Sequence, residues 1–411
     1  MKRVLKMIAW FLGSLLLILG VLALLYFINP TAVEDQVFET FYPKVTKEEK
    51  FQEPIRVEIP EVYELMWIAC SLTDAFEKDA NLTTRNKRFE DYHQAVTTHF
   101  GAYKSHPLIQ ELQKFFADGN YDLDHHAVRF LSLNYELDEQ GRLRKTGDYR
   151  VPGILTYFFK NQAFLIPTHR KMISDFSQKT DFKAFYESQQ SFYNQLIQNY
   201  HELGDFDQML TWLEERYPNR IPSYRILCSP MTGGFHNTMG FDGVTEGFHQ
   251  ALMFVNAPPA QLGSMTDSVR VRVKSGYSRV VFTEIDHNYV NPMADQFRSR
   301  IEQAMPDYKV WNADKQGYTS SMNTFLEYMT WGMYSLFAQE QFSGWEYDYA
   351  ISRVEDMMDD YRGFYRFSDF NQELISYYEN TNAKQDMPAL YEHMLDWMER
   401  NQQASLSTPQ H

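Results

Sequence analysis

The sequence predicts an α+β protein that is predominantly helical, with a small central β-sheet behind one N-terminal transmembrane helix. Apolar residues recur at helical spacing along most of the chain after residue 60. Short apolar runs bounded by turn-forming residues predict strands within residues 220–282. One long uncharged run stands near the N-terminus. With 411 residues, 44% of them hydrophobic, the chain has enough apolar material for packed cores.

The uncharged run covers residues 7–28. Its 22 residues would extend roughly 33 Å as a helix, which is enough to cross a hydrocarbon core of about 30 Å. A cleaved signal peptide is the alternative, but such peptides have a shorter apolar region, and no small-x-small cleavage site precedes Pro30. Because Lys2, Arg3 and Lys6 precede the run, the positive-inside rule predicts a cytoplasmic N-terminus and an exported body. In a Gram-negative source, that body would be periplasmic.

The exported body is strongly acidic. The whole chain has a formal charge of −15, and residues 1–30 contribute +3, which leaves −18 for the remainder. Because nucleic-acid affinity comes largely from Lys and Arg side chains that neutralise phosphates, we expect no nucleic-acid partner. The predicted partner is instead the membrane, through the N-terminal helix.

Six segments follow from the pattern. The first strand is expected at residues 55–59 and further strands at 224–228, 251–255 and 269–273, with a glycine-rich connection at 232–240. Helices are expected from Pro60 onward and at 277–291, 319–342, 347–360 and 387–401. The segments are a cytoplasmic stub with the transmembrane anchor (1–30), a linker (31–54), a helical region (55–219), a core with the sheet and the site helices (220–342), C-terminal helices (343–400) and a flexible tail (401–411).

Cys70 and Cys228 are the two cysteines of the chain. Both stand in apolar segments, so a disulfide in an oxidising compartment and two buried free thiols are both open interpretations. Neither cysteine has the spacing of a zinc knuckle or of a redox motif.

Residues 281–292 hold the most informative pattern. Glu284, His287, Asn288 and Asn291 stand at i, i+3, i+4 and i+7, so a helix would place them in one polar stripe. A carboxylate and an imidazole at this spacing can converge on one metal ion or share acid/base chemistry. An ordinary amphipathic helix whose histidine makes a hydrogen bond is the alternative.

The run Thr283-Glu284-Ile285-Asp286-His287, followed by Tyr289-Val-Asn-Pro292, resembles the zinc-binding helix H-E-x-x-H of gluzincin-type metallopeptidases. It is most similar to the form in an uncharacterised family of exported bacterial domains, whose helix continues with aromatic-Val-Asn-Pro. The resemblance covers most of residues 55–340 and is specific at 281–292. It implies a zincin-like active-site helix, zinc as cofactor, a peptide or protein as substrate or ligand, and hydrolysis by a metal-activated water.

The resemblance also assigns roles to single residues. Glu284 matches the general base, His287 matches a zinc ligand, and Glu327 on a later helix is the candidate for the third ligand. Thr283 stands where the family has its first histidine, and threonine is a poor, neutral ligand. Either Glu284 becomes a ligand, or another group such as His236 replaces the lost histidine, or metal binding is lost; Asn291 is an additional candidate.

Three functions follow from these alternatives. The first is a membrane-anchored, gluzincin-like metallohydrolase with a degenerate metal motif. The second is a non-catalytic pseudopeptidase that keeps the cleft and binds a ligand. The third is a structural binding module of the cell envelope, in which the polar stripe only makes hydrogen bonds between helices.

Overall fold

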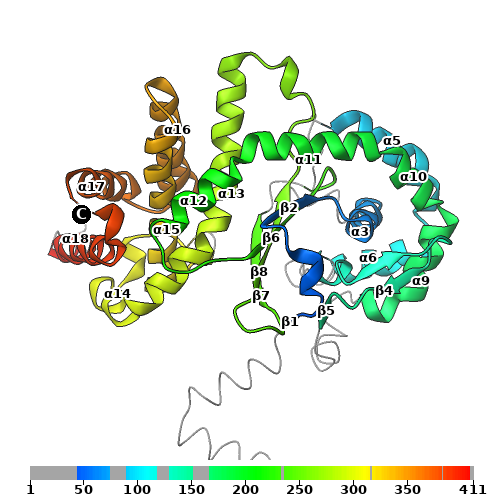
Figure 1. The fold of residues 1–411 in the computed structure, drawn as a ribbon, viewed down its shortest axis with the longest axis horizontal. Helices are drawn as coiled ribbons and strands as arrows, with labels where there is room; N and C mark the ends of the chain where they lie inside the picture. The colour runs from blue at the N-terminus through cyan, green and yellow to red at the C-terminus, as the bar shows by residue number, and fades with distance from the viewer. Residues whose placement is uncertain are drawn as a thin grey trace, which may run out of the picture.

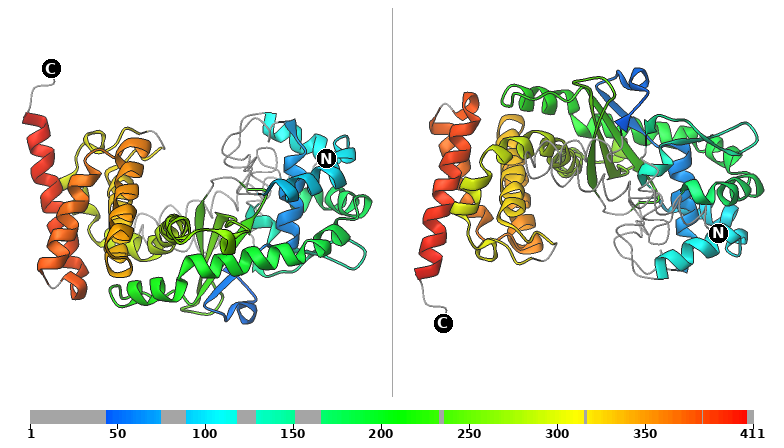
Figure 2. Two further views of the ribbon diagram at one scale, coloured as in Figure 1. Left: turned by 90° about the horizontal axis from the view of Figure 1, so that it is seen from above. Right: turned by 90° about the horizontal axis from the view of Figure 1, so that it is seen from below.

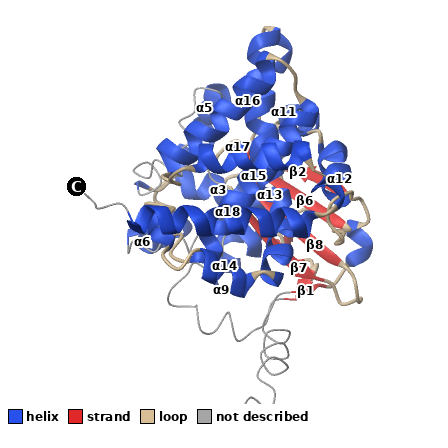
Figure 3. Ribbon diagram, turned by 90° about the vertical axis from the view of Figure 1, so that its left-hand side faces the viewer, coloured by secondary structure: helices blue, strands red, loops and turns tan. Residues whose placement is uncertain are grey.

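A computed structural model describes residues 44–74, 89–117, 129–150, 166–232, 236–314, 317–381 and 383–407. Helices make up most of this part of the molecule (Figure 3), so the predicted predominantly helical α+β class is confirmed. The predicted transmembrane run, residues 7–28, lies outside the described residues. Within the described ranges, no helix combines the length and apolar character needed to cross a membrane.

A four-stranded mixed sheet lies at the centre of the fold (Figure 1). β6 is buried along its whole length, as a central strand covered on both faces is, although its sequence includes Arg225. It pairs in parallel with β2 on one side and with β8 on the other, while β7 is antiparallel to β8 and forms the edge. The strand order is β2 (Ile55–Glu58), β6 (Ser223–Ser229), β8 (His249–Asn256) and β7 (Asn237–Asp242).

The sheet confirms three of the predicted strands and corrects two other expectations. Residues 269–273 are not a strand, because they belong to the first part of α13 (Asp267–Gln296). Arg270 and Lys274, four positions apart on this helix, form ion pairs with Glu202 of α11 and with Asp205, which follows α11. The predicted glycine-rich connection at 232–240 also contains the start of edge strand β7.

Two groups of helices stand at opposite ends of the sheet (Figures 1 and 2). Helices α11 (Gln190–Gly204) and α12 (Phe206–Glu214) lead from the first group toward the second. The first group contains α3 (Glu61–Ser71), α5 (Glu90–Phe100), α6 (Pro107–Ala117), α9 (Ile166–Lys179) and α10 (Phe182–Ser188). The second contains α14 (Arg298–Ala304), α15 (Ser321–Gln341), α16 (Trp345–Glu355), the π-helical segment η6 (Asp356–Arg362), α17 (Phe367–Asn380) and α18 (Met387–Ser407).

The C-terminal helix, the two cysteines and the short elements complete the described part. Helix α18 continues to Ser407, into the segment 401–411 that is predicted to be a flexible tail. Cys70 and Cys228 are both buried, and neither forms a disulfide. The remaining elements are the strands β1 (Lys44–Val45), β3 (Tyr135–Leu137), β4 (Leu143–Lys145) and β5 (Tyr149–Arg150), and the 3₁₀ turns η1 (Glu48–Phe51), η3 (Gly101–Tyr103), η4 (Leu262–Ser264), η5 (Tyr308–Val310) and η7 (Ala383–Gln385).

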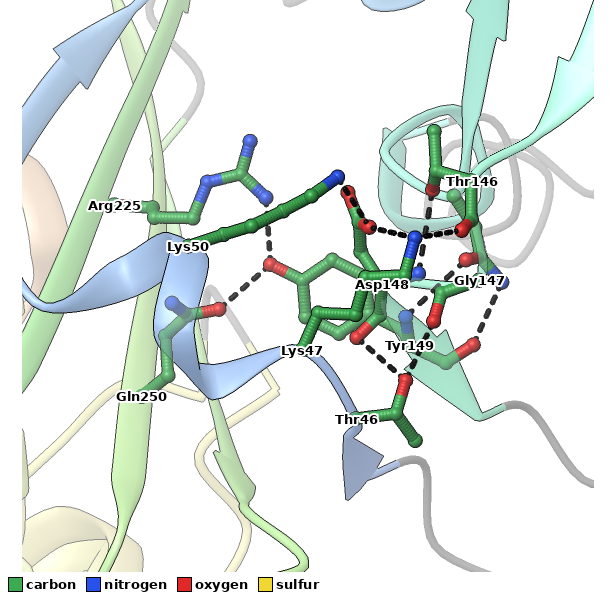
Figure 4. Close-up of polar contacts among 10 residues, drawn as sticks. Thr46, Lys47, Lys50, Thr146, Gly147, Asp148, Tyr149, Arg225 and Gln250 are labelled. Atoms are coloured by element: carbon green, nitrogen blue, oxygen red, sulfur yellow. Dashed lines mark hydrogen bonds and ion pairs between the residues drawn. The ribbon is translucent and has the colours of Figure 1, made fainter.

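A buried polar network joins the start of the described chain to the sheet (Figure 4). Tyr149 donates a hydrogen bond of 2.6 Å to Gln250 Oε1 of β8 and accepts one of 2.6 Å from Arg225 Nη1 of β6. Lys50 Nζ lies 2.8 Å from Asp148 Oδ1, which ties η1 to the segment before β5. Because each buried polar group in this network has a partner, the network fixes the first strands against the central sheet.

Helices α13 and α15 pack side by side and bring the candidate site residues to the sheet. Phe282 of α13 stacks on Phe337 of α15, with ring centroids 4.8 Å apart, and Trp212 of α12 meets both rings. Burial of these aromatic residues fixes the rotation of α13 and turns its polar stripe toward β7. Pro292 lies inside α13, which continues beyond it to Gln296.

Candidate functional site

A polar pocket of about 400 Å³ lies between the edge strand β7 and helix α13. Four of the five predicted site residues line it, namely Glu284, His287, Asn291 and His236. The fifth, Glu327, lies next to His287 on α15. The other lining residues are Asn237, Thr238, Gly240, Asn288 and Tyr318.

The rotation of α13 explains which residues reach the pocket. Val281, Phe282, Ile285 and Tyr289 are buried in the core, while the stripe at i, i+3, i+4 and i+7 from Glu284 faces β7. The period of 3.6 residues per turn separates these two sets, as the sequence pattern predicts.

Glu284 is tied to the edge strand. Thr238 Oγ1 lies 2.5 Å from Glu284 Oε2 and 3.2 Å from the carbonyl oxygen of the same residue. Burial raises the pKa of Glu284, while nearby His287 and the hydrogen bond from Thr238 act in the opposite direction. A carboxyl group with a raised pKa can hold or release a proton nearer to neutral pH than an exposed glutamate can.

Asp286, in the middle of the same motif, is fully buried. Burial raises the pKa of Asp286 well above its usual value, and the negative charges of Glu327 and Glu284 raise it further. Asp286 is not among the residues that line the pocket. We therefore expect a neutral side chain with a structural role.

His287 connects the pocket to α15. Its Nδ1 lies 3.2 Å from Asn291 Oδ1 and 3.5 Å from Thr330 Oγ1. Its Nε2 lies 4.0 Å from Glu327 Oε1. His287 and Glu327, which the resemblance assigns to one site, are therefore neighbours in the fold.

Arg362 is the site residue that sequence reasoning missed. Its Nη1 lies 2.7 Å from Glu327 Oε2, and its Nη2 donates a hydrogen bond of 2.8 Å to the hydroxyl of Tyr318 in the pocket. The guanidinium also lies about 5 Å from the ring centroids of Trp331 and Phe364. No local motif marks Arg362, because it ends the π-helical segment η6, far along the chain from Glu284.

A catalytic zinc ion needs three protein ligands, and His287 and Glu327 are two candidates. A separation of 4.0 Å between His287 and Glu327 is one that an ion bound about 2.0–2.2 Å from each donor could bridge. A third donor is missing at residue 283, because Thr283 Oγ1 donates a hydrogen bond of 3.1 Å to the carbonyl oxygen of Val280. Among the described residues, no three His, Cys, Asp or Glu side chains are arranged to hold a metal ion. The donor set therefore does not fit a catalytic zinc site of the usual kind.

No protein-family model matches this sequence, and comparisons with curated proteins and with solved structures also give no match. The site combines a carboxyl group with a raised pKa, an imidazole, several amide side chains and an open strand edge in one polar pocket.

Proposed function

We propose that the protein is a membrane-anchored, gluzincin-like protein of the cell envelope that binds peptides in this pocket without hydrolysing them. The ion pair between Arg362 and Glu327, 2.7 Å in length, is the observation that carries the proposal. It gives the carboxylate expected to bind zinc a fixed positive partner from the chain itself. Because a guanidinium stays protonated and has no open coordination position, it cannot activate a water molecule as a metal ion does.

The open edge of β7 supports a peptide as the ligand. Within the described residues, the outer side of this strand meets another strand only through the bridge between Gly243, just past its end, and Val45. The backbone N–H and C=O groups along Asn237–Phe241 that face away from β8 can therefore pair with an added strand. The amide side chains of Asn288 and Asn291 line the same pocket and can bind the polar groups of such a peptide.

Metal-dependent hydrolysis is the second candidate function. The approach of His287 Nε2 to Glu327 Oε1, at 4.0 Å, favours it. In that case Glu284 would have to supply the ligand that Thr283 lacks, and Arg362 would have to release Glu327.

Zinc titration of the full-length protein in detergent distinguishes the two candidates. We expect the wild type to bind little zinc, and Thr283→His to bind zinc markedly more tightly, because imidazoles at 283 and 287 lie at i, i+4 on one helix. Wild type and Thr283→His should both retain a fluorescein-labelled random hexapeptide mixture, measured by fluorescence anisotropy, and the wild type should leave the mixture uncleaved. Tight zinc binding by the wild type, weakened by Glu284→Gln and accompanied by cleavage, would establish the metallohydrolase instead.

Membrane anchoring has its own test. An alkaline phosphatase fused after His411 should be active only on the exported side, and the protein should stay in membranes after an alkaline carbonate wash. This follows from the uncharged run at 7–28 and the preceding positive charges. A shortened, soluble product would mean that the run is a cleaved signal peptide.

A further inference from the structure

Three polar atoms near the start of β7 are shielded from solvent and lack hydrogen-bond partners. They are His236 Nδ1, Asn237 Oδ1 and Arg279 Nε. His236 and Asn237 line the pocket at the start of β7. Arg279, on α13 one helical turn before Thr283, is not among the lining residues, but it lies close enough to His236 for its charge to lower the pKa of that imidazole. Because most buried polar groups in proteins have partners, a group of three without any indicates a missing ligand.

Arg279 is the most informative of the three. Its guanidinium lies 5.5 Å from the ring centroid of Trp331, whose ring also contacts Arg362. Among the described residues, no carboxylate forms an ion pair with Arg279. Burial lowers the pKa of Arg279, and the charge of Arg353 lowers it further, while the influences that raise it come from tyrosines and not from acids. Arg279 is half-buried, and its Nε is shielded from solvent and has no hydrogen-bond partner, so this end of the pocket is suited to an anion.

We infer that the pocket binds the free α-carboxylate of a peptide C-terminus, with Arg279 as its counter-ion. This inference rests on the proposed peptide-binding function. The planar guanidinium can bind a carboxylate through Nε and a terminal nitrogen together. The carboxylate of the peptide would lie beside His236 and Trp331. Asn237 Oδ1 would accept a hydrogen bond from the backbone N–H of the last peptide residue.

The direction of β7 agrees with this assignment. The strand runs from Asn237 to Asp242, so a peptide added antiparallel to it would run from the Asp242 end toward the Asn237 end. Such a peptide would end beside His236 and Arg279. The antiparallel pairing and the unpaired Nε of Arg279 thus both place the C-terminus of the peptide near the start of β7.

Fluorescence anisotropy with two forms of one probe tests the inference. The probe is an N-terminally fluorescein-labelled random hexapeptide mixture, prepared once with free carboxylates and once with C-terminal amides, and titrated with the full-length protein. We expect the free acids to bind about 10- to 100-fold more tightly than the amides, the range given by one charged hydrogen-bonded contact. Arg279→Gln should remove this preference, and Arg279→Lys should retain part of it.

Arg272→Gln is the matched control, because Arg272 lies two helical turns earlier on α13 and stacks on Tyr349 outside the pocket. It should keep the preference for the free acid. Equal binding of acids and amides by the wild type would overturn the inference and leave the peptide-binding function standing. A preference that survives in Arg279→Gln would overturn the role of Arg279, and binding of neither probe would overturn the proposed function itself.

Discussion

The hydroxyl of Thr238 on edge strand β7 lies 2.5 Å from the carboxyl oxygen Oε2 of Glu284 on α13. This contact sets the width of the pocket at its centre, because it joins the strand that would receive a peptide to the helix that carries the polar stripe. It also places the carboxyl group with the raised pKa directly beside the open strand edge.

Loss of this contact should be measurable. Thr238→Val leaves Glu284 Oε2 without its buried donor, so we expect the free energy of unfolding to fall by about 1–3 kcal/mol. Thr98→Val is the control, because the hydroxyl of Thr98 only accepts an exposed hydrogen bond from Gln94. Urea unfolding followed by circular dichroism measures both. Equal effects of the two substitutions would contradict a special role for the Thr238 contact.

The pair formed by Arg362 and Glu327 should be sensitive to the loss of one partner alone. Both side chains are buried, so Arg362→Met leaves an uncompensated carboxylate and should cost about 3–5 kcal/mol in unfolding free energy. Adding Glu327→Gln to the same chain should recover part of this loss, because it removes the buried charge.

The exposed pair of Arg298 and Asp295 on neighbouring helical turns provides the comparison. Arg298→Met should change the unfolding free energy by less than about 1 kcal/mol. A double variant of Arg362 and Glu327 that is less stable than Arg362→Met would show that Glu327 is not held by charge pairing.

Glu64 should make stability fall as the pH rises. It is fully buried in α3, and its Oε1 accepts a hydrogen bond from Tyr92. Burial raises the pKa of Glu64 from 4.5 to about 7. The group therefore contributes its full stability below about pH 4.5 and loses it as the pH rises through 7, by up to about 3 kcal/mol. Glu64→Gln should remove this part of the pH dependence. The measurement is the difference in unfolding free energy between wild type and variant from pH 4.5 to 8, and a constant difference would contradict the raised pKa.

Two glycines in helices should respond to alanine with opposite signs. A Cβ at Gly332 of α15 would lie 2.5 Å from Leu374 Cδ2 of α17, and Leu374 is fully buried, so Gly332→Ala should destabilise by about 1–3 kcal/mol. A Cβ at Gly276 of α13 would meet nothing within 4 Å, so Gly276→Ala should stabilise by about 0.5–1 kcal/mol. Thermal unfolding of both variants checks the pair, and stabilisation by Gly332→Ala would contradict the close packing of α15 on α17.

The sequence alone determined the features that depend on local periodicity. The apolar runs at 224–228 and 251–255, bounded by turn-forming residues, identify two strands, and the spacing of Glu284, His287 and Asn291 places them on one helical face. These patterns are readable because each arises from the repeat of a single element. The same local view failed at residues 269–273, where alternating Val and Arg imitate a strand although the residues form part of the first turns of α13.

Only the tertiary structure decided what surrounds the polar stripe. It placed Arg362 against Glu327, turned Thr283 toward the carbonyl of Val280, and left Arg279 Nε shielded from solvent without a hydrogen-bond partner. These relationships join segments that are distant in sequence, and they depend on how the aromatic core rotates α13 and packs α15 against it. A charge is costly or favourable only relative to its neighbours in space, so no spacing along the chain could predict them.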